Sequence, residues 1–151
     1  MRGAIFSMPR PVRRVLAVML ALAVFTAFAL AIFEEPLVEN FGTIQWDAIS
    51  VHFFNLYFSS DAWHGGALPL WTPYLFGGFP QIADLQVAVF YPINLAIGLF
   101  TTFTPDLVLY QVVTHYVLAA LFAFLFAYHL SRNLLFSLGG GLAYAFGGFM
   151  V

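Results

Sequence analysis

The side chains of this chain that could do chemistry are mainly carboxylates, and they are confined to one stretch. All 7 acidic residues lie between positions 34 and 106. A carboxylate can serve as a general base or orient a substrate hydroxyl. Asp47 stands at the start of an apolar helical pattern. It is either a first-turn residue favoured by the helix dipole or a carboxylate kept for catalysis. Spacing alone favours the first interpretation and leaves the second open.

Asp84, Gln86 and His64 are further polar candidates in the same stretch. Asp84 and Gln86 are polar residues in an apolar setting, and His64 could pair with Asp61 on one helical turn. His64 has no second histidine or cysteine at metal-ligand spacing, so no protein metal cage is predicted. The chain has no nucleophile elbow, phosphate-binding loop, dinucleotide fingerprint or zinc-protease motif.

The composition predicts a membrane protein. Hydrophobic residues make up 62% of the 151 residues and charged residues 8%, against about 45–50% and about 25% in soluble domains. A soluble fold of this size could not bury so much apolar surface. The net charge of −2 does not favour a nucleic-acid partner. The absence of cysteine excludes disulfides and thiolate chemistry.

Three apolar runs predict membrane-spanning helices at 15–33, 107–130 and 134–151. At about 1.5 Å per residue, the first run nearly matches a hydrocarbon core of roughly 30 Å. A cleaved signal peptide is the alternative for this run, but the run exceeds the usual apolar region of about 7–15 residues. A short helical connection at 131–133 is predicted to join the other two spans.

The distribution of charge predicts the orientation. Four arginines precede the first run, and Arg132 follows the second. Because positive flanks resist translocation, the N-terminus is predicted to be cytoplasmic and residues 34–106 extracytoplasmic. The segment 87–103 is apolar enough to span, but spanning would place Arg132 outside. It is therefore predicted to be an interfacial helix, as is the segment 46–60, which has an apolar face at helical spacing.

The stretch ALPLWTPYLFGGFPQI, residues 67–82, combines prolines, a Gly-Gly pair and aromatic rings without any charge. Proline cannot donate a backbone hydrogen bond. Irregular backbone at membrane depth is tolerated only where it packs in protein or lines a wet cavity. The stretch therefore predicts a rigid packed wall, with Trp71 and Tyr74 as rings suited to the membrane interface.

Two side-chain patterns lie within the predicted spans. Polar groups in a span normally face a bundle interior or a cavity. The span 107–130 has a polar stripe on one helical face, formed by Tyr110, Gln111, Thr114 and His115. This stripe is predicted either to form hydrogen bonds with neighbouring helices or to line a pathway. A small-residue face for close helix packing is predicted in the last span, at a spacing of four, from Gly139, Ala143 and Gly147.

Several motifs carry a family resemblance. They are GALPLWTPYLFGGFP at 66–80, ADLQ at 83–86, FYPINL at 90–95 and LAYAFGGF at 142–149. Together they resemble the YfhO-like family of bacterial membrane proteins, within the GT-C glycosyltransferase superfamily. The resemblance covers roughly residues 40–151. The chain departs from the family pattern at Thr72, where asparagine is frequent.

The resemblance implies an all-α polytopic protein of GT-C-like fold in the bacterial cytoplasmic membrane, of which this chain would be the N-terminal part and inactive alone. Members of the family are expected to transfer a sugar from a polyprenyl-phosphate carrier to a cell-envelope acceptor on the outer face. Asp47 matches the carboxylate of the first outer loop that acts as base or positions the acceptor. The substrate contacts are expected from His64, Trp71, Tyr74, Asp84, Gln86, Gln111 and His115.

The departing phosphate would need cationic help, which a divalent cation or basic residues outside this chain would supply. No arginine or lysine of this chain is predicted on the outer side. The alternative function is non-catalytic: a transporter, a flippase-like protein or an envelope-assembly protein. The expected partners are the lipid bilayer and the polyprenyl-phosphate-linked sugar.

Overall fold

The computed structural model describes residues 9–38 and 48–147. Over these residues the chain is helical and has no strand beyond one isolated antiparallel bridge, so the prediction of an all-helical protein is confirmed there. The chain divides into two compact units. Unit 1 comprises Met1–Leu37 and Val112–Val151, and unit 2 comprises Val38–Gln111.

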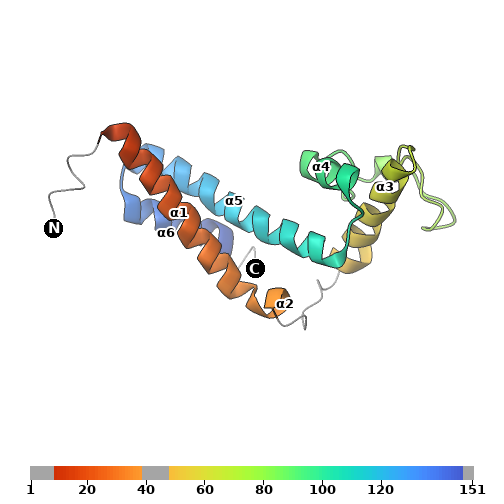
Figure 1. The fold of residues 1–151 in the computed structure, drawn as a ribbon, viewed down its shortest axis with the longest axis horizontal. Helices are drawn as coiled ribbons and strands as arrows, with labels where there is room; N and C mark the ends of the chain where they lie inside the picture. The colour runs from red at the N-terminus through yellow and green to blue at the C-terminus, as the bar shows by residue number, and fades with distance from the viewer. Residues whose placement is uncertain (1–8, 39–47, 148–151) are drawn as a thin grey trace. The chain divides into compact units, whose positions relative to one another are not determined.

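Unit 1 is built from α1 (Arg10–Ile32), α6 (Leu134–Phe146) and most of α5 (Pro105–Ser131), which lie side by side in Figure 1; the short α2 (Glu34–Val38) follows α1. Small residues and two rings form its core. The Phe25 and Phe124 rings meet edge to face with centroids 6.1 Å apart. The other buried residues of this core are Ala17, Ala21, Ala120 and Ala145. Alanine is short and so permits close packing of helices, which occurs between α1 and α6.

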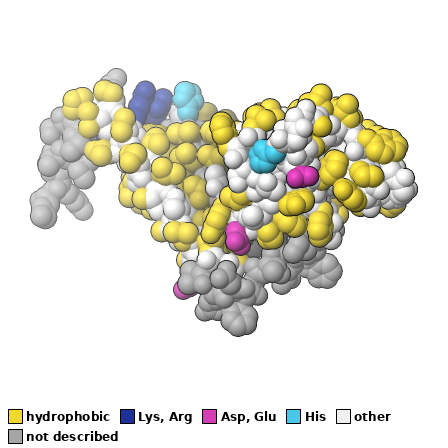
Figure 2. Space-filling model, turned by 45° about the vertical axis from the view of Figure 1, so that its right-hand side comes forward, with side chains coloured by type: hydrophobic (Ala, Val, Ile, Leu, Met, Phe, Trp, Pro, Cys, Tyr) yellow, Lys and Arg dark blue, Asp and Glu magenta, His cyan; other side chains and the backbone are white. Residues whose placement is uncertain are grey.

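Two helices are long and apolar enough to cross a membrane by length and composition, Pro11–Ile32 and Pro105–Ser131. Much of their apolar surface is exposed, including Met19 (59%) and Phe126 (69%). Hydrophobic side chains cover much of the face shown in Figure 2. Such exposure suits contact with lipid chains better than the buried interior of a soluble protein. The crossing itself stays a prediction.

The third predicted span, 134–151, differs in length from the helix observed. Helix α6 has 13 residues and ends at Phe146, and the chain is extended at Gly147. At about 1.5 Å per residue the helix rises about 20 Å, which is less than a hydrocarbon core of roughly 30 Å. Residues 148–151 lie outside the described part of the chain.

Of the helical connection predicted at 131–133, only Ser131 is helical, as the last residue of α5, and Arg132 and Asn133 are not. Arg132 adopts a positive φ of 54°. Asn133 then caps α6, because its side-chain oxygen accepts a hydrogen bond of 3.1 Å from the amide of Phe136. An asparagine at this position satisfies one of the amides that a helix start leaves unpaired.

The small-residue face of α6 was predicted in the wrong register. A Cβ built on Gly139 meets nothing within 4 Å, so this glycine faces open space. The residues of α6 that are buried are Ser137, Gly141 and Ala145. The same spacing of four therefore occurs on the packed side, two residues out of phase with the predicted set.

In unit 2 a π-helical segment, Ala48–Phe53, continues into α3 (Phe54–His64). The helix predicted at 46–60 thus extends to His64, and positions 46 and 47 lie outside the described residues. Helix α3 packs against α4 (Pro92–Phe100). The Ser60 hydroxyl accepts a hydrogen bond of 3.1 Å from the amide of Phe103, and Phe103 is buried with Leu56 and Val108. This core holds the start of α5 to α3.

The segment predicted as an interfacial helix at 87–103 is helical only over α4. This helix has 9 residues, beginning at Pro92 and ending at Phe100. Its rise of about 14 Å is too short for one helix to cross a bilayer. Proline fits the first turn because its missing N–H is unpaired there in any helix.

The packing of α6 generates a stability prediction for unit 1. In Gly141→Ala the new methyl group would lie 2.6 Å from the Phe25 ring and 2.7 Å from the Ala120 carbonyl oxygen. Because a backbone oxygen cannot move aside cheaply, we expect a loss of about 1–3 kcal/mol. This loss outweighs the gain of about 1 kcal/mol in helix propensity. A lower melting temperature of the purified protein in detergent would show it.

Gly139→Ala is the matched control on the same helix. Its methyl group meets nothing within 4 Å, so the melting temperature should stay the same or rise. Equal shifts for the two variants would contradict the observed register of α6.

Candidate binding cavity

Unit 2 contains a cavity of about 700 Å³, which falls in the size range of small-molecule sites, about 300–1,000 Å³. One side comes from the first helices of the unit and the other from the segment that follows α3. The residues that line it are Ser50, Val51, Phe54, Asn55, Tyr57, Phe58, Asp61, Thr72, Tyr74, Leu75, Phe76, Phe79, Asp84 and Gln86.

Helix α3 and the π-helical segment before it supply polar groups as well as rings. Asn55 and Ser59 are one turn apart and both buried, and the Ser59 hydroxyl donates to the Asn55 carbonyl oxygen at 2.8 Å. The Asn55 amide donates in turn to the carbonyl of Val51, also at 2.8 Å. Asp61, one turn nearer the C-terminus than Tyr57, is exposed. The lining therefore combines aromatic rings with groups that can bond hydroxyls.

The proline-rich stretch folds as an ordered hairpin rather than as a loose loop. The amide of Thr72 donates to the Phe79 carbonyl at 2.9 Å, and the amide of Phe79 donates to the Thr72 carbonyl at 2.8 Å. Positive φ angles at Phe76, Gly77 and Gly78 turn the chain. A Cβ on Gly78 would lie 2.6 Å from the Trp71 ring, so only glycine fits there.

The hairpin presents its aromatic residues outward and toward α3. Tyr74 is 81% exposed and Phe76 is 91% exposed. The Tyr74 ring also meets the Phe58 ring of α3 edge to face, with centroids 5.9 Å apart. The sequence-based expectation of a packed wall therefore holds for the base of the hairpin at Thr72, which is buried, and not for its tip.

Gln81 ties the end of the hairpin segment to α3. Its side chain is fully buried, and its Nε2 donates to the Asn55 carbonyl oxygen at 2.9 Å and to the Ser59 hydroxyl at 2.8 Å. Its Oε1 has no hydrogen-bond partner within the described part of the chain. Sequence reasoning missed this residue, although a glutamine closing an uncharged apolar stretch was a visible signal.

Three of the residues predicted to bind substrate do line this cavity: Tyr74, Asp84 and Gln86. Asp84 is half-buried. Its Oδ1 accepts a hydrogen bond of 2.9 Å from the backbone N–H of Gln86, which forms an Asx turn. Trp71 does not line the cavity, and its ring lies against Gly78 of the hairpin. Asp61 is a lining carboxylate that the set of predicted binding residues did not include.

Among the described residues, three other predicted site residues do not line this cavity: His64, Gln111 and His115. His64 is exposed, and its Nδ1 lies 3.3 Å from the Thr102 hydroxyl, not against Asp61. Gln111 donates to the Asn94 side-chain oxygen and so joins α5 to α4. His115 is half-buried and belongs to unit 1. Asp47 lies outside the described residues.

The charge of the lining restricts what the cavity can hold. Asp61 and Asp84 are its only ionisable carboxylates in the described part of the chain, and no arginine or lysine lines it. Two carboxylates without a cation favour hydroxyl donors and disfavour a phosphate. Among the described residues no group of three or more His, Cys, Asp and Glu could hold a metal ion.

The hydrogen bonds of Gln81 generate a prediction about the hairpin. In Gln81→Glu both donated bonds would be lost and carboxylate oxygens would face the Asn55 carbonyl oxygen. We expect the hairpin to open more readily by about 1–3 kcal/mol. Faster hydrogen–deuterium exchange at the Thr72 and Phe79 amides would show this.

Gln86→Glu is the control, because it makes the same chemical change at an exposed position of the same segment. Exchange at the hairpin amides should be unaffected there. If Gln81→Glu also left exchange unchanged, Gln81 would not anchor the hairpin.

Comparisons of this chain with family models, curated proteins and solved structures found no match. A function is therefore inferred from the residues and from the cavity that they line. The chemistry that the cavity favours is the binding of a neutral ligand with hydroxyl groups and apolar faces.

Proposed function

We propose that this chain is part of a membrane glycosyltransferase that transfers a sugar from a polyprenyl-phosphate carrier to an acceptor of the cell envelope. The observation that carries the proposal is the cavity of about 700 Å³, which combines aromatic rings with two carboxylates. The long apolar helices α1 and α5 support a setting in the membrane, where such a carrier would be found. The resemblance to YfhO-like proteins supports the reaction class.

The lining suits a sugar ring. A pyranose has apolar C–H faces, which pack on aromatic rings such as those of Tyr74 and Phe58. It also has hydroxyl groups, which donate to ionised carboxylates in strong hydrogen bonds. Asp61 and Asp84 would accept these bonds, and the exposed rings at the hairpin tip would contact the isoprenoid chain or the lipid surface.

The chemical step follows from what such a transfer requires. The acceptor oxygen forms a bond to the anomeric carbon, its proton passes to a base, and the carrier phosphate leaves with the electron pair of the broken C–O bond. We assign the role of base to Asp47, which precedes Ser50, the first described lining residue, by three positions in the sequence. The phosphate would have to lie away from Asp61 and Asp84, because like charges repel.

Three matched Asp→Asn substitutions in the complete native protein separate these roles. We expect Asp47→Asn to lower kcat by about 10²–10⁴-fold, because it removes the general base. Asp84→Asn should raise KM about tenfold or more, because it replaces a charged acceptor of sugar hydroxyl bonds. Sugar transfer from a polyprenyl-phosphate sugar, followed with radiolabelled donor, measures both constants.

Asp106→Asn is the control, since Asp106 is exposed in the first turn of α5 and does not line the cavity. Both constants should match those of the unmodified protein. Transfer at an unchanged rate by Asp47→Asn would remove Asp47 from the mechanism. Carrier binding that depends on Asp84 without any turnover would favour the non-catalytic alternative, a transporter or assembly protein.

A further inference from the structure

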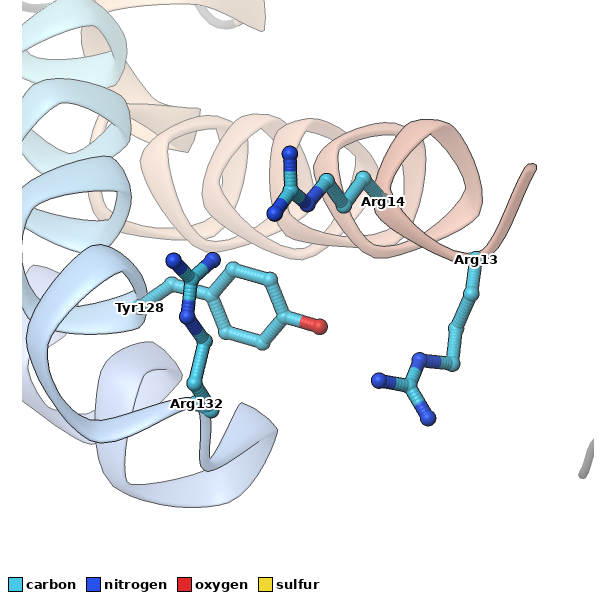
Figure 3. Close-up of a pocket in the computed structure, with 4 residues that line it drawn as sticks. All are labelled: Arg13, Arg14, Tyr128 and Arg132. Atoms are coloured by element: carbon cyan, nitrogen blue, oxygen red, sulfur yellow. The ribbon is translucent and has the colours of Figure 1, made fainter. Parts of the chain in front are cut away.

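A second cavity, of about 320 Å³, lies in unit 1 and has the opposite charge. Its lining residues are Arg13, Arg14, Tyr128 and Arg132. The first two come from the start of α1 and the other two from the end of α5 and the residue after it. Figure 3 shows the four side chains around this space. Three guanidinium groups are thus gathered from distant parts of the sequence.

Within the described part of the chain nothing neutralises the three arginines. No described carboxylate lines the cavity, and none of the three guanidinium groups makes an ion pair with a described residue. Grouped cations repel one another, and an anion held among them relieves this repulsion. In the view of Figure 3 the Tyr128 hydroxyl points toward the space beside the α1 arginines, where it could donate a further hydrogen bond.

The backbone at Arg132 adds an independent observation. Its φ of 54° lies in the left-handed region, which costs a residue with a side chain roughly 1–2 kcal/mol. Its amide donates to the Tyr128 carbonyl at 3.2 Å, so Arg132 ends α5 at a position where glycine is normally preferred. A signal for membrane orientation would need only a positive charge near the helix end. It would not need arginine at this strained position.

We propose that this arginine cavity binds a phosphate group, and that the phosphate belongs to the headgroup of an anionic lipid. Guanidinium groups match phosphate oxygens with paired, charge-assisted hydrogen bonds. Basic pockets between helices at the membrane surface suit such headgroups. Arg13 is followed at helical spacing by the exposed Leu16 and Leu20, which offer an apolar track for the acyl chains. The inference does not depend on the proposed sugar transfer.

The test titrates the complete purified protein in detergent with three probes: short-chain phosphatidylglycerol, short-chain phosphatidylcholine and inorganic phosphate. We expect phosphatidylglycerol to bind most tightly, because it adds an apolar track to a net negative charge. Arg14→Gln should weaken this binding about tenfold, the loss of one charge-assisted contact. His129→Gln changes an exposed residue in the last turn of α5 that does not line the cavity, and it should leave binding unchanged.

Arg132→Gly separates binding from folding. Glycine adopts the positive φ without strain, so the melting temperature should hold or rise, while phosphatidylglycerol binding should fall about tenfold. Inorganic phosphate that binds as tightly as phosphatidylglycerol, with the same loss in both variants, would keep the phosphate site and overturn the lipid as its source. Binding that survives in both Arg14→Gln and Arg132→Gly would overturn the site itself.

Discussion

The proposed sugar site depends on the two hydrogen bonds that the buried side chain of Gln81 donates. It joins the hairpin segment to α3 through the Asn55 carbonyl oxygen and the Ser59 hydroxyl. A buried amide that donates two hydrogen bonds is stabilising, whereas the same amide unpaired would cost several kcal/mol, roughly 2–7. Asn55 and Ser59, which supply the two acceptors, lie on one face of α3. The hairpin therefore packs with its aromatic rings facing that helix. The cavity is the space left between them.

The two cavities carry opposite charge and so favour different chemical groups of a carrier-linked sugar or a lipid. Among the described lining residues, the cavity of unit 2 has two carboxylates and no arginine or lysine, which suits hydroxyl groups. The described lining of the cavity in unit 1 has three arginines and no carboxylate, which suits phosphate. The helices of unit 1 pack through small residues such as Gly141 and Ala145 and through the two buried rings, and many of their other large apolar side chains remain on the outside. A protein surface of this kind is stable only in an apolar environment or against a partner.

Local patterns predicted much of this arrangement, and non-local contacts account for the rest. The charge-free runs predicted helices that the structure describes as α1 and α5, since apolar periodicity is a property of the segment itself. The register of α6 was missed because small residues recur at a spacing of four on two faces, and only neighbouring helices select Gly141 over Gly139. Gln81 was missed because its partners lie 22 and 26 residues earlier. Asp84 and Tyr74 were predicted as site residues, and both line the cavity. Asp61 was not predicted, and it lines the cavity because of where α3 lies.

We propose that the cavity between α3 and the hairpin holds the sugar of a polyprenyl-phosphate carrier. The most direct measurement is photo-crosslinking of the complete native protein with a carrier analogue that bears a photoreactive group on the sugar, followed by mass spectrometry of the labelled peptides. Labelling within residues 50–61 and 72–86, competed away by unmodified carrier-linked sugar, is the predicted result. Competed labelling confined to other segments would contradict the claim.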